Sequence, residues 1–539
     1  MDRRDFLRDT LAAGAATGIL PRSSAQPGGR PSALRGPVAP IPFELEEITV
    51  AALQEGMASG RWTARSIAEA YLGRIEAVDK SGPAINSVIE VNPEALAIAD
   101  RMDAERKAGK TRGPLHGIPV LVKDNLDTGD RMVTTAGSLA LAGSRAPRDS
   151  TVVAKLREAG AVLLGKTNLS EWANYRSTRS TSGWSGRGGL TRHPYILDRN
   201  ACGSSSGSGA AAAANLAAIT IGTETDGSVV CPSSICGLVG IKPTVGLVSR
   251  AGIIPISATQ DTAGPMCRTV ADAAVLLTVI QGYDARDAAT APTRGTAATD
   301  FTTSLKPDGL KGTRLGVARK GFDLPSNVDP ILSEAIAALR HLGAEIVDPA
   351  EVPNVAKLGD PETLVLDFEF KAGIAAYLAS RGTTAEARTL EDLIRFNTEH
   401  REKEMPWFGQ EIFERSAKRG ALTTPEYRKA HSACRRLSRG LGIDAIMTRH
   451  RLDAVVAITA GASWPTDLVN GDRYTGGCST PPAVAGYPHV TVPAGLVHEL
   501  PIGLSFFGRA WSEVALIRFA YAFEQGTRLR RPPRFLPSL

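Results

Sequence analysis

One stretch of this 539-residue chain, residues 202–232, constrains its fold more than any other. Its first part, Cys202–Gly209, reads CGSSSGSG, which suits a tight loop that presents hydroxyl and backbone N–H groups. The alanine run behind it has the highest helix propensity, so we expect a helix of about two turns from near Gly209. The apolar segment Ala217–Gly222 predicts a strand, and this strand leads into a second loop, Thr223–Ser228.

Two serines in these loops, Ser204 and Ser228, are candidates for chemistry. If the helix runs back along the strand, both loops reach the same edge of a sheet, where open α/β folds place their sites. Loops rich in glycine and serine more often bind phosphate or link domains. The phosphate-binding motif needs a lysine after its glycines, however, and none follows here. A plain linker would not lead into an apolar helix and strand, so the pattern favours a catalytic site.

These loops and the run GIKPTVG at 240–246 resemble the amidase signature family, serine hydrolases with a Ser-cisSer-Lys triad. Similar motifs are GPLHGIPVLVKDN at 113–125 and GKTNLSEW at 165–172. The resemblance covers most of the chain from about residue 45. The segment TETDGS at 223–228 is most similar to bacterial peptide amidases. It implies an α/β fold, a single large domain with a mixed central sheet covered by helices on both faces.

The resemblance also implies the roles of individual residues. Ser228 corresponds to the nucleophile, Ser204 to a bridging serine that follows a cis peptide bond, and Lys123 to the base. The family usually has glycine at the position of Asp226, where a carboxylate would oppose an oxyanion unless it points away. The oxyanion hole corresponds to the backbone N–H groups of Thr225, Asp226, Gly227 and Ser228.

A lysine can replace the usual histidine base only in its neutral form. Because its ordinary pKa is near 10.4, about one free lysine in a few thousand is neutral at pH 7, so burial must lower the pKa of Lys123 by several units. The apolar residues 118–122 predict that burial. Lys123 would then take the proton of Ser204 while Ser204 takes that of Ser228. His116, the histidine nearest a motif, is expected to pack in its loop.

The N-terminal residues carry a targeting pattern. Residues 1–25 combine the pair Arg3-Arg4, the mild apolar run Leu11–Leu20 and the small-residue site Ser23–Ala25. This predicts a twin-arginine signal peptide and export of the folded protein to a bacterial periplasm or beyond. Residues 26–42 are a proline-rich linker, and the catalytic domain fills 43–539. No segment has the length and apolarity of a membrane span.

Apolar spacing predicts helices at Val50–Met57 and Ile67–Val78, with Thr63 as an N-cap, and Ser150 caps another helix. Residues from about 360 to 445 are charged and lack strand signals, and we interpret them as a helical excursion over the sheet that shapes the substrate pocket. Single aromatic residues more often pack in the core than line a pocket. Four are nevertheless candidates for the wall of the substrate pocket: Trp184, Trp407, Phe408 and Phe413.

Composition argues against several other classes of function. A net charge of +6 is modest for this length and predicts no nucleic-acid partner. Six scattered cysteines show no metal-ligand spacing, so we expect neither a metal nor a cofactor. Because folding precedes export, the cysteines are expected to be free, packed thiols. Cys202 and Cys231 flank the serine loops, where a thiol reagent would inhibit by crowding.

The predicted function is hydrolysis of a carboxamide to a carboxylic acid and ammonia through a seryl acyl-enzyme. We expect C-terminal peptide amides as substrates and a monomeric protein. One alternative is an aryl or aliphatic amide hydrolase of the same family. A second is a glutaminyl-tRNA amidotransferase-type subunit, which the export pattern disfavours. A third is a non-catalytic amide-binding protein, which the presence of all three triad positions disfavours.

Overall fold

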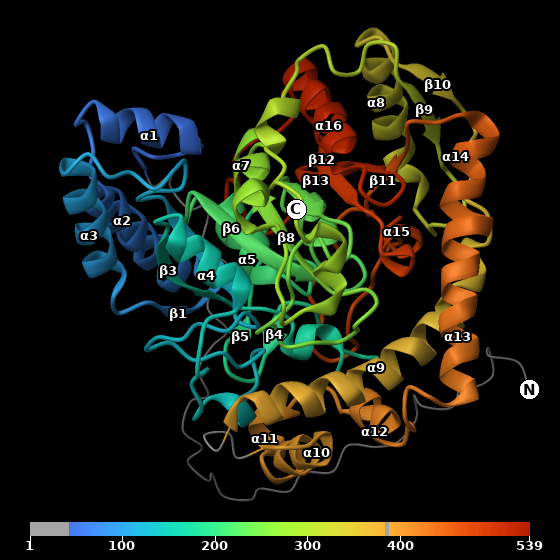
Figure 1. Cartoon of the computed structure of the whole chain (residues 1–539), viewed down its shortest axis with the longest axis horizontal. Coiled ribbons are helices and arrows are strands. Elements are labelled where there is room, and N and C mark those ends of the chain that lie inside the picture. The colour runs from blue at the N-terminus through green and yellow to red at the C-terminus, as the bar shows by residue number, and fades with distance from the viewer. Residues whose placement is uncertain (1–41, 383–386) are drawn as a thin grey trace, which may run out of the picture. The chain divides into compact units, whose positions relative to one another are not determined.

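The apolar segments of the sequence form a mixed sheet of eleven strands in the computed structural model, which describes residues 42–382 and 387–539 (Figure 1). The strands are β1 (Val88–Val91), β2 (Pro119–Lys123), β3 (Val162–Thr167), β6 (Ile219–Glu224), β7 (Val239–Lys242), β8 (Thr262–Cys267), β9 (Arg314–Val317), β10 (Glu345–Val347), β11 (Ala454–Ile458), β12 (His489–Val497) and β13 (Leu500–Phe507). A separate two-stranded sheet pairs β4 (Trp184–Ser185) with β5 (Gly189–Leu190).

The strand order of the large sheet is β1-β3-β2-β6-β8-β7-β12-β13-β11-β9-β10. Its two flanks contain the parallel pairs, β3-β2-β6 on one side and β11-β9-β10 on the other, and the centre is antiparallel. Val122 pairs with Ile221 in the parallel ladder of β2 and β6. The carboxyl ends of these two strands therefore meet at one edge, where Lys123 ends β2 and Glu224 ends β6.

The α-helices of the described residues are α1 (Val50–Ala58), α2 (Ala64–Arg74), α3 (Ala95–Lys107), α4 (Thr151–Glu158), α5 (Ser206–Ala213), α6 (Val230–Ile235), α7 (Val270–Ile280), α8 (Asp329–His341), α9 (Gly359–Ser380), α10 (Leu390–Glu399), α11 (Arg401–Glu404), α12 (Glu411–Ala417), α13 (Pro425–Arg435), α14 (Asp444–His450), α15 (Thr480–Ala485) and α16 (Glu513–Thr527). Both predicted N-caps are confirmed. The Thr63 side chain accepts from Ser66 N–H, and the Ser150 side chain accepts from Val153 N–H.

Helices cover the sheet on both faces. In β13, a Cβ added at Gly503 would lie 2.8 Å from the hydroxyl of Ser234 in α6, whereas the ring of Phe506 packs on Phe523 of α16. Because side chains alternate along a strand, α6 and α16 lie on opposite faces. Helix α5 contacts α6, and α7 contacts α16. The described residues belong to one compact unit, and the α/β fold with a mixed, doubly covered sheet is confirmed.

Helix α5 begins at Ser206, three residues before the expected start near Gly209, and every one of its residues is buried. Its serines, glycines and alanines allow the backbone to approach its neighbours closely. A Cβ at Gly207 would lie 2.4 Å from the carbonyl oxygens of both Ser87 and Asn168. Strand β6 runs two residues beyond the predicted Ala217–Gly222, because its pairing with β8 continues to Glu224.

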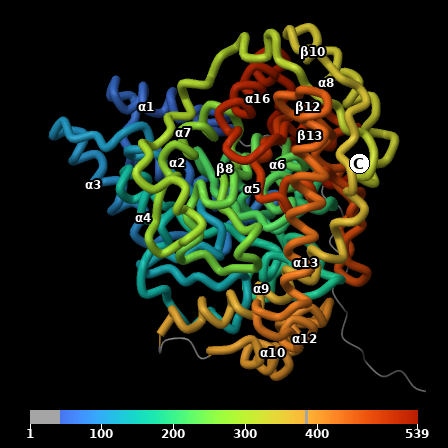
Figure 2. Tube along the Cα trace, turned by 45° about the vertical axis from the view of Figure 1, so that its right-hand side comes forward, coloured from blue at the N-terminus to red at the C-terminus, as the bar shows by residue number. Residues whose placement is uncertain are grey.

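Helices α9 to α13 occupy most of the predicted excursion, followed by a π-helix, η9 (Arg436–Ile443). Figure 1 and Figure 2 both place α9, α10, α12 and α13 together. Phe413 is buried against Trp172 and Phe370, and Phe408 packs edge-on against Trp184. Within the described ranges, no helix has the length and apolarity that crossing a bilayer requires. The predicted signal peptide, 1–25, and residues 26–41 of the predicted linker lie outside the described residues.

Candidate active site

Lys123, the predicted base, is fully buried at the carboxyl end of β2. Its Nζ lies 2.8 Å from Ser204 Oγ, 3.0 Å from Ser205 Oγ and 2.9 Å from Thr223 Oγ1. The structure therefore brings together two of the three predicted triad residues, although they are 81 positions apart in the sequence. Two further hydroxyls, which the sequence did not single out, hold the amine in place.

The environment of Lys123 changes its protonation. Burial lowers the pKa of its amine to about 7, and this effect exceeds the opposing influence of the carboxylates of Asp261 and Glu224. At a pKa near 7, about half of the lysine is neutral at neutral pH. The amine can therefore accept a proton from a neighbouring hydroxyl, which a charged ammonium cannot do.

The first serine loop presents Ser204, which is fully buried, and the Gly203–Ser204 peptide bond is cis. Position 203 has no room for a side chain, because a Cβ there would lie 2.2 Å from Ser170 Oγ. The Ser204 carbonyl accepts from the N–H of Ser170 at 3.0 Å. Ser205 Oγ donates to the Thr223 carbonyl at 3.0 Å and so ties this loop to the end of β6.

The second loop presents Ser228, the predicted nucleophile, which is slightly open to solvent (8% exposed). The loop turns at Gly227, where φ is +77°, a conformation that favours glycine. The Ser228 carbonyl accepts from Ser205 N–H at 3.2 Å and joins the two loops. No hydrogen bond between described residues links Ser204 Oγ directly to Ser228 Oγ, and catalytic hydrogen bonds commonly tighten only in the substrate complex.

Glu224 fixes the direction of this loop. Its Oε2 accepts from the N–H groups of Val229 at 2.8 Å and Val230 at 3.0 Å, at the start of α6. Over the described parts of the chain, no intramolecular hydrogen bond uses the predicted donors, the N–H groups of Thr225, Asp226, Gly227 and Ser228. These four backbone donors are therefore available to an oxyanion.

The carboxylate of Asp226 is held away from these donors, where its Oδ2 accepts from Thr480 Oγ1 at 2.7 Å. Burial raises the pKa of Asp226, and burial together with the Asp226 charge raises the pKa of Glu362 well above its usual range. Both shifts favour the protonated, neutral form of the carboxyl groups. Protonation of either one would reduce the negative charge near the predicted oxyanion site.

A disulfide bond joins Cys202 to Cys231, with their Cα atoms 6.5 Å apart. The expectation of free thiols is wrong for this pair, and so is the expectation that they react with a thiol reagent. The two residues are 29 positions apart, and only the meeting of the two serine loops brings their sulfur atoms together. Cys236, Cys267, Cys434 and Cys478 are free and buried, as expected.

A cavity of about 270 Å³ adjoins the two loops at Gly203 and Gly227. Its outer wall comes from residues 464–480, where Trp464 packs edge-on against Tyr474. The expectation that the helical excursion shapes the pocket is wrong for this cavity, because none of the described residues that line it lies between 360 and 445. This wall was not predicted from the sequence. Its signal in the sequence is the long loop after β11, which contains the aromatic residues Trp464 and Tyr474.

The other singled-out residues lie away from this cavity. The four aromatic candidates pack elsewhere or, in the case of Trp407, face solvent with an exposed fraction of 43%. His116 is buried and its Nε2 lies 2.9 Å from the Met102 carbonyl, which confirms its packing role. In residues 42–382 and 387–539, no group of three or more His, Cys, Asp or Glu side chains could hold a metal ion.

Comparison with known proteins agrees with this geometry. The family model described as Amidase matches residues 66–517. The crystal structure of native peptide amidase from Stenotrophomonas maltophilia has a TM-score of 0.88 and 51% sequence identity, and the match covers 92% of this chain and 100% of that one. A probable amidase from Arabidopsis thaliana is 41% identical over 508 residues, 92% of this chain and 93% of the plant protein. A glutamyl-tRNA(Gln) amidotransferase subunit from Chloroflexus aurantiacus is 35% identical over 90% of this chain and 97% of its own length. The chain therefore belongs to the amidase signature family and is an enzyme of the amidase type.

Proposed function

We propose that this enzyme hydrolyses C-terminal peptide amides to peptides with a free carboxylate, and releases ammonia. The observation that carries the proposal is the buried Lys123 amine, 2.8 Å from Ser204 Oγ, beside a cavity that borders the Ser228 loop. The peptide amidase from Stenotrophomonas maltophilia, at 51% identity, supports the same substrate class.

The mechanism follows from the positions of the three side chains. Neutral Lys123 accepts the hydroxyl proton of Ser204 while Ser204 accepts that of Ser228, and Ser228 Oγ attacks the amide carbonyl carbon. Backbone N–H groups of the loop residues Thr225, Asp226, Gly227 and Ser228 stabilise the resulting oxyanion. When the C–N bond breaks, the proton returns through Ser204 to the leaving nitrogen, which departs as ammonia. Water, activated by the same relay, then cleaves the acyl-enzyme and releases the carboxylic acid.

The shape of the cavity supports a peptide rather than a very small amide. Tyr474 presents aromatic surface and is 47% exposed, so a substrate can extend past it into solvent, whereas Trp464 is buried against it. Asp472 also lines the cavity, but its carboxylate accepts from Ser182 N–H and from Trp464 Nε1. Asp472 therefore holds the cavity wall in place through these bonds. We expect an apolar side chain of the substrate to contact the aromatic rings of this wall.

The test measures release of the amine product from four substrates: ammonia from a dipeptide amide and from a simple aliphatic amide, methylamine from the N-methylamide of the same dipeptide, and aniline from an anilide. We expect the highest kcat/KM for the dipeptide amide. The Ser228→Ala variant is the control for chemistry at this site and should release ammonia more slowly by a factor of about 10³ or more. Turnover of the anilide or the aliphatic amide without any turnover of the peptide amide would replace this proposal with the aryl or aliphatic alternative.

A second candidate, a protein that supplies ammonia within a tRNA-dependent amidotransferase, draws on the similarity to the amidotransferase subunit from Chloroflexus aurantiacus. It requires partner proteins, whereas a peptide amidase acts alone. Size-exclusion chromatography after expression in the native host separates the two. We expect an active monomer, and activity only in a larger complex would favour the amidotransferase role.

We also propose that the protein is exported through its twin-arginine pattern. The support is Arg3-Arg4 followed by the apolar run Leu11–Leu20 and the small-residue site at Ser23–Ala25. Cell fractionation with mass spectrometry should find a shortened N-terminus in the periplasm or medium. In an Arg3→Lys, Arg4→Lys variant the protein should stay in the cytoplasm, and unchanged export of that variant would contradict the proposal.

A further inference from the structure

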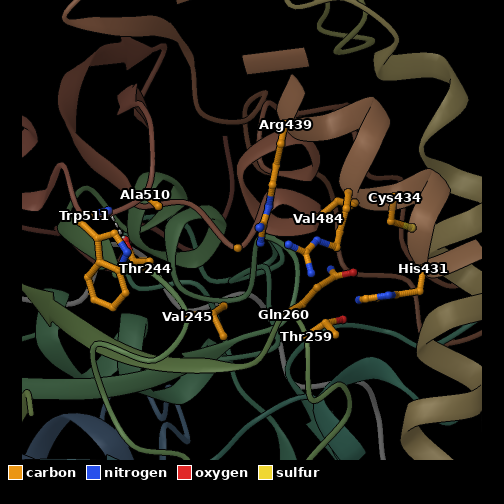
Figure 3. A pocket seen from close by; sticks show the side chains of 12 residues that line it. Thr244, Val245, Thr259, Gln260, His431, Cys434, Arg439, Val484, Ala510 and Trp511 are labelled. Atoms are coloured by element: carbon orange, nitrogen blue, oxygen red, sulfur yellow. Dashed lines mark hydrogen bonds between the residues drawn. The ribbon is translucent and has the colours of Figure 1, made fainter. Parts of the chain in front are cut away.

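A second cavity, also of about 270 Å³, borders the C-terminal end of α15 at Val484 and Gly486, and the described residues that line it differ from those of the first (Figure 3). One wall comes from α13 and η9. The opposite wall comes from residues 244–245 and 510–511, and Thr259 and Gln260 lie between. Gln260 Nε2 donates to Glu362 Oε1 at 2.8 Å and to the Thr225 carbonyl at 3.2 Å, so this residue separates the cavity from the predicted oxyanion loop.

Basic side chains form the helical wall. His431, Arg435 and Arg439 follow one another at intervals of four residues, the spacing that places side chains on one face of a helix. Figure 3 shows the side chains of His431 and Arg439 pointing toward Gln260. The cavity thus receives two guanidinium groups and an imidazole from a single helical face.

These two guanidinium groups are not matched by carboxylates. Within the described residues, neither Arg435 nor Arg439 forms an ion pair. Arg439 Nε donates to the Ala485 carbonyl at 2.8 Å, and its guanidinium lies 5.3 Å from the centre of the Tyr487 ring. Burial and the charge of Arg435 both lower the pKa of Arg439, so an anion placed between them would relieve the repulsion.

The acidic side chains behind this wall have other partners. Asp444 accepts from the Tyr487 hydroxyl at 3.0 Å and faces Arg509, and Glu369 accepts from Ser257, Thr259 and Tyr427. Glu362 is bonded to Gln260. Asp444 also acts on Arg439, since its charge partly offsets the lowering of the Arg439 pKa. Among the described residues that line the cavity itself, however, none carries a carboxylate, and the charged side chains of the lining are basic.

The wall that faces the arginines is apolar. It consists of Val245, Ala510 and the ring of Trp511, which is 45% exposed. Trp511 N–H donates to Thr244 Oγ1 at 2.9 Å, a bond drawn in Figure 3, and this bond fixes the backbone that carries the ring. An inorganic anion would leave this surface unused, whereas a ligand with a charged end and an apolar end would contact both walls.

We propose that this cavity is a binding site for a small organic carboxylate with an apolar body. The carboxylate bonds to the guanidinium groups of Arg435 and Arg439, which match its planar geometry. The body of the ligand lies against Trp511 and Val245. The site is separate from the serine loops, and its occupancy does not depend on whether the enzyme hydrolyses peptide amides.

Calorimetric titration of the full-length protein with benzoate tests the proposal, with acetate, inorganic phosphate and benzyl alcohol as comparison ligands. We expect benzoate to bind more tightly than any of the three. Arg435→Gln and Arg439→Gln should each weaken benzoate binding at least tenfold. Arg436→Gln is the matched control, because this exposed neighbour carries the same charge and does not line the cavity, and it should leave binding unchanged.

Trp511→Ala should weaken benzoate binding several-fold and leave acetate binding unchanged. Equal loss of affinity in the Arg436 and Arg435 variants would mean that benzoate responds only to net charge, and would overturn the proposal. Phosphate binding as tight as that of benzoate, unaffected by Trp511→Ala, would identify a site for inorganic anions instead. Thermal unfolding of each variant shows whether a lost signal reflects lost folding, and Arg435 is exposed enough for its variant to fold.

Discussion

The lysine site and the helical arm α9–α13 treat buried polar residues differently. At the lysine site, Lys123 is fully buried, its amine bonds to the hydroxyls of Ser204 and Ser205, and burial moves its pKa to about 7. In the arm, the buried carboxylate of Asp367 is instead held in an ion pair with Arg415. Chemistry at the serine loops is therefore expected to depend on the lysine site, where burial shifts an amine toward its neutral form.

The largest effect is expected when a side chain of the proton relay is removed. Ser228→Ala and Lys123→Ala should each lower kcat about 10³-fold or more, because each removes a part of one proton relay. Trp407→Ala, in the arm, should leave kcat within about twofold, since it changes an exposed side chain away from the cavity. Steady-state ammonia release measures all three. Near-normal turnover in either loop variant would end the triad assignment.

The pH dependence tests whether burial of Lys123 matters as proposed. The base must be neutral to accept a proton, and its pKa is near 7, so kcat/KM should rise with pH and level off above about pH 7. Below pH 6 the activity should fall about tenfold per pH unit. A profile of kcat/KM from pH 5 to 9 measures this. Full activity at pH 5 would show that the amine does not act as the base.

Reduction of the disulfide tests how firmly the two serine loops are held together. Dithiothreitol should convert the Cys202–Cys231 bond to two thiols and lower the free energy of unfolding by about 3.6 kcal/mol, as expected for a loop of this length. We also expect kcat to fall several-fold as the loops separate. A Cys202→Ser, Cys231→Ser variant should resemble the reduced enzyme and no longer respond to dithiothreitol. If dithiothreitol affected this variant as strongly as the unmodified enzyme, the effect would not come from the Cys202–Cys231 bond.

The smallest expected effect concerns the outer wall of the active-site cavity. Tyr474→Ala should raise KM for an apolar peptide amide about three- to tenfold and leave kcat almost unchanged, because the ring contacts substrate equally in the ground and transition states. Phe396→Ala, in helix α10 of the arm, is the matched aromatic control. A larger effect at Phe396 than at Tyr474 would mean that the arm, rather than residues 464–480, shapes substrate binding.

Much of the fold could be predicted because its signals are local. Continuous apolar runs marked the strands around Lys123 and before Ser228, and Thr63 and Ser150 marked helix starts by residue type alone. The start of α5 was predicted three residues too late, because the tight packing of Gly207 against other segments decides where that helix begins. The boundary depended on contacts that no local pattern contains.

The sequence alone determined the residue types of the site: two serine loops, an apolar strand that ends in a lysine, and a family resemblance that joins them. Only the tertiary structure decided the Cys202–Cys231 bond, the Ser205 and Thr223 hydroxyls around the lysine, and the wall at 464–480. The physical reason is that local patterns follow from the bonding geometry and burial of neighbouring residues. Contacts between distant segments, and the pKa values that burial sets, exist only once those segments have packed.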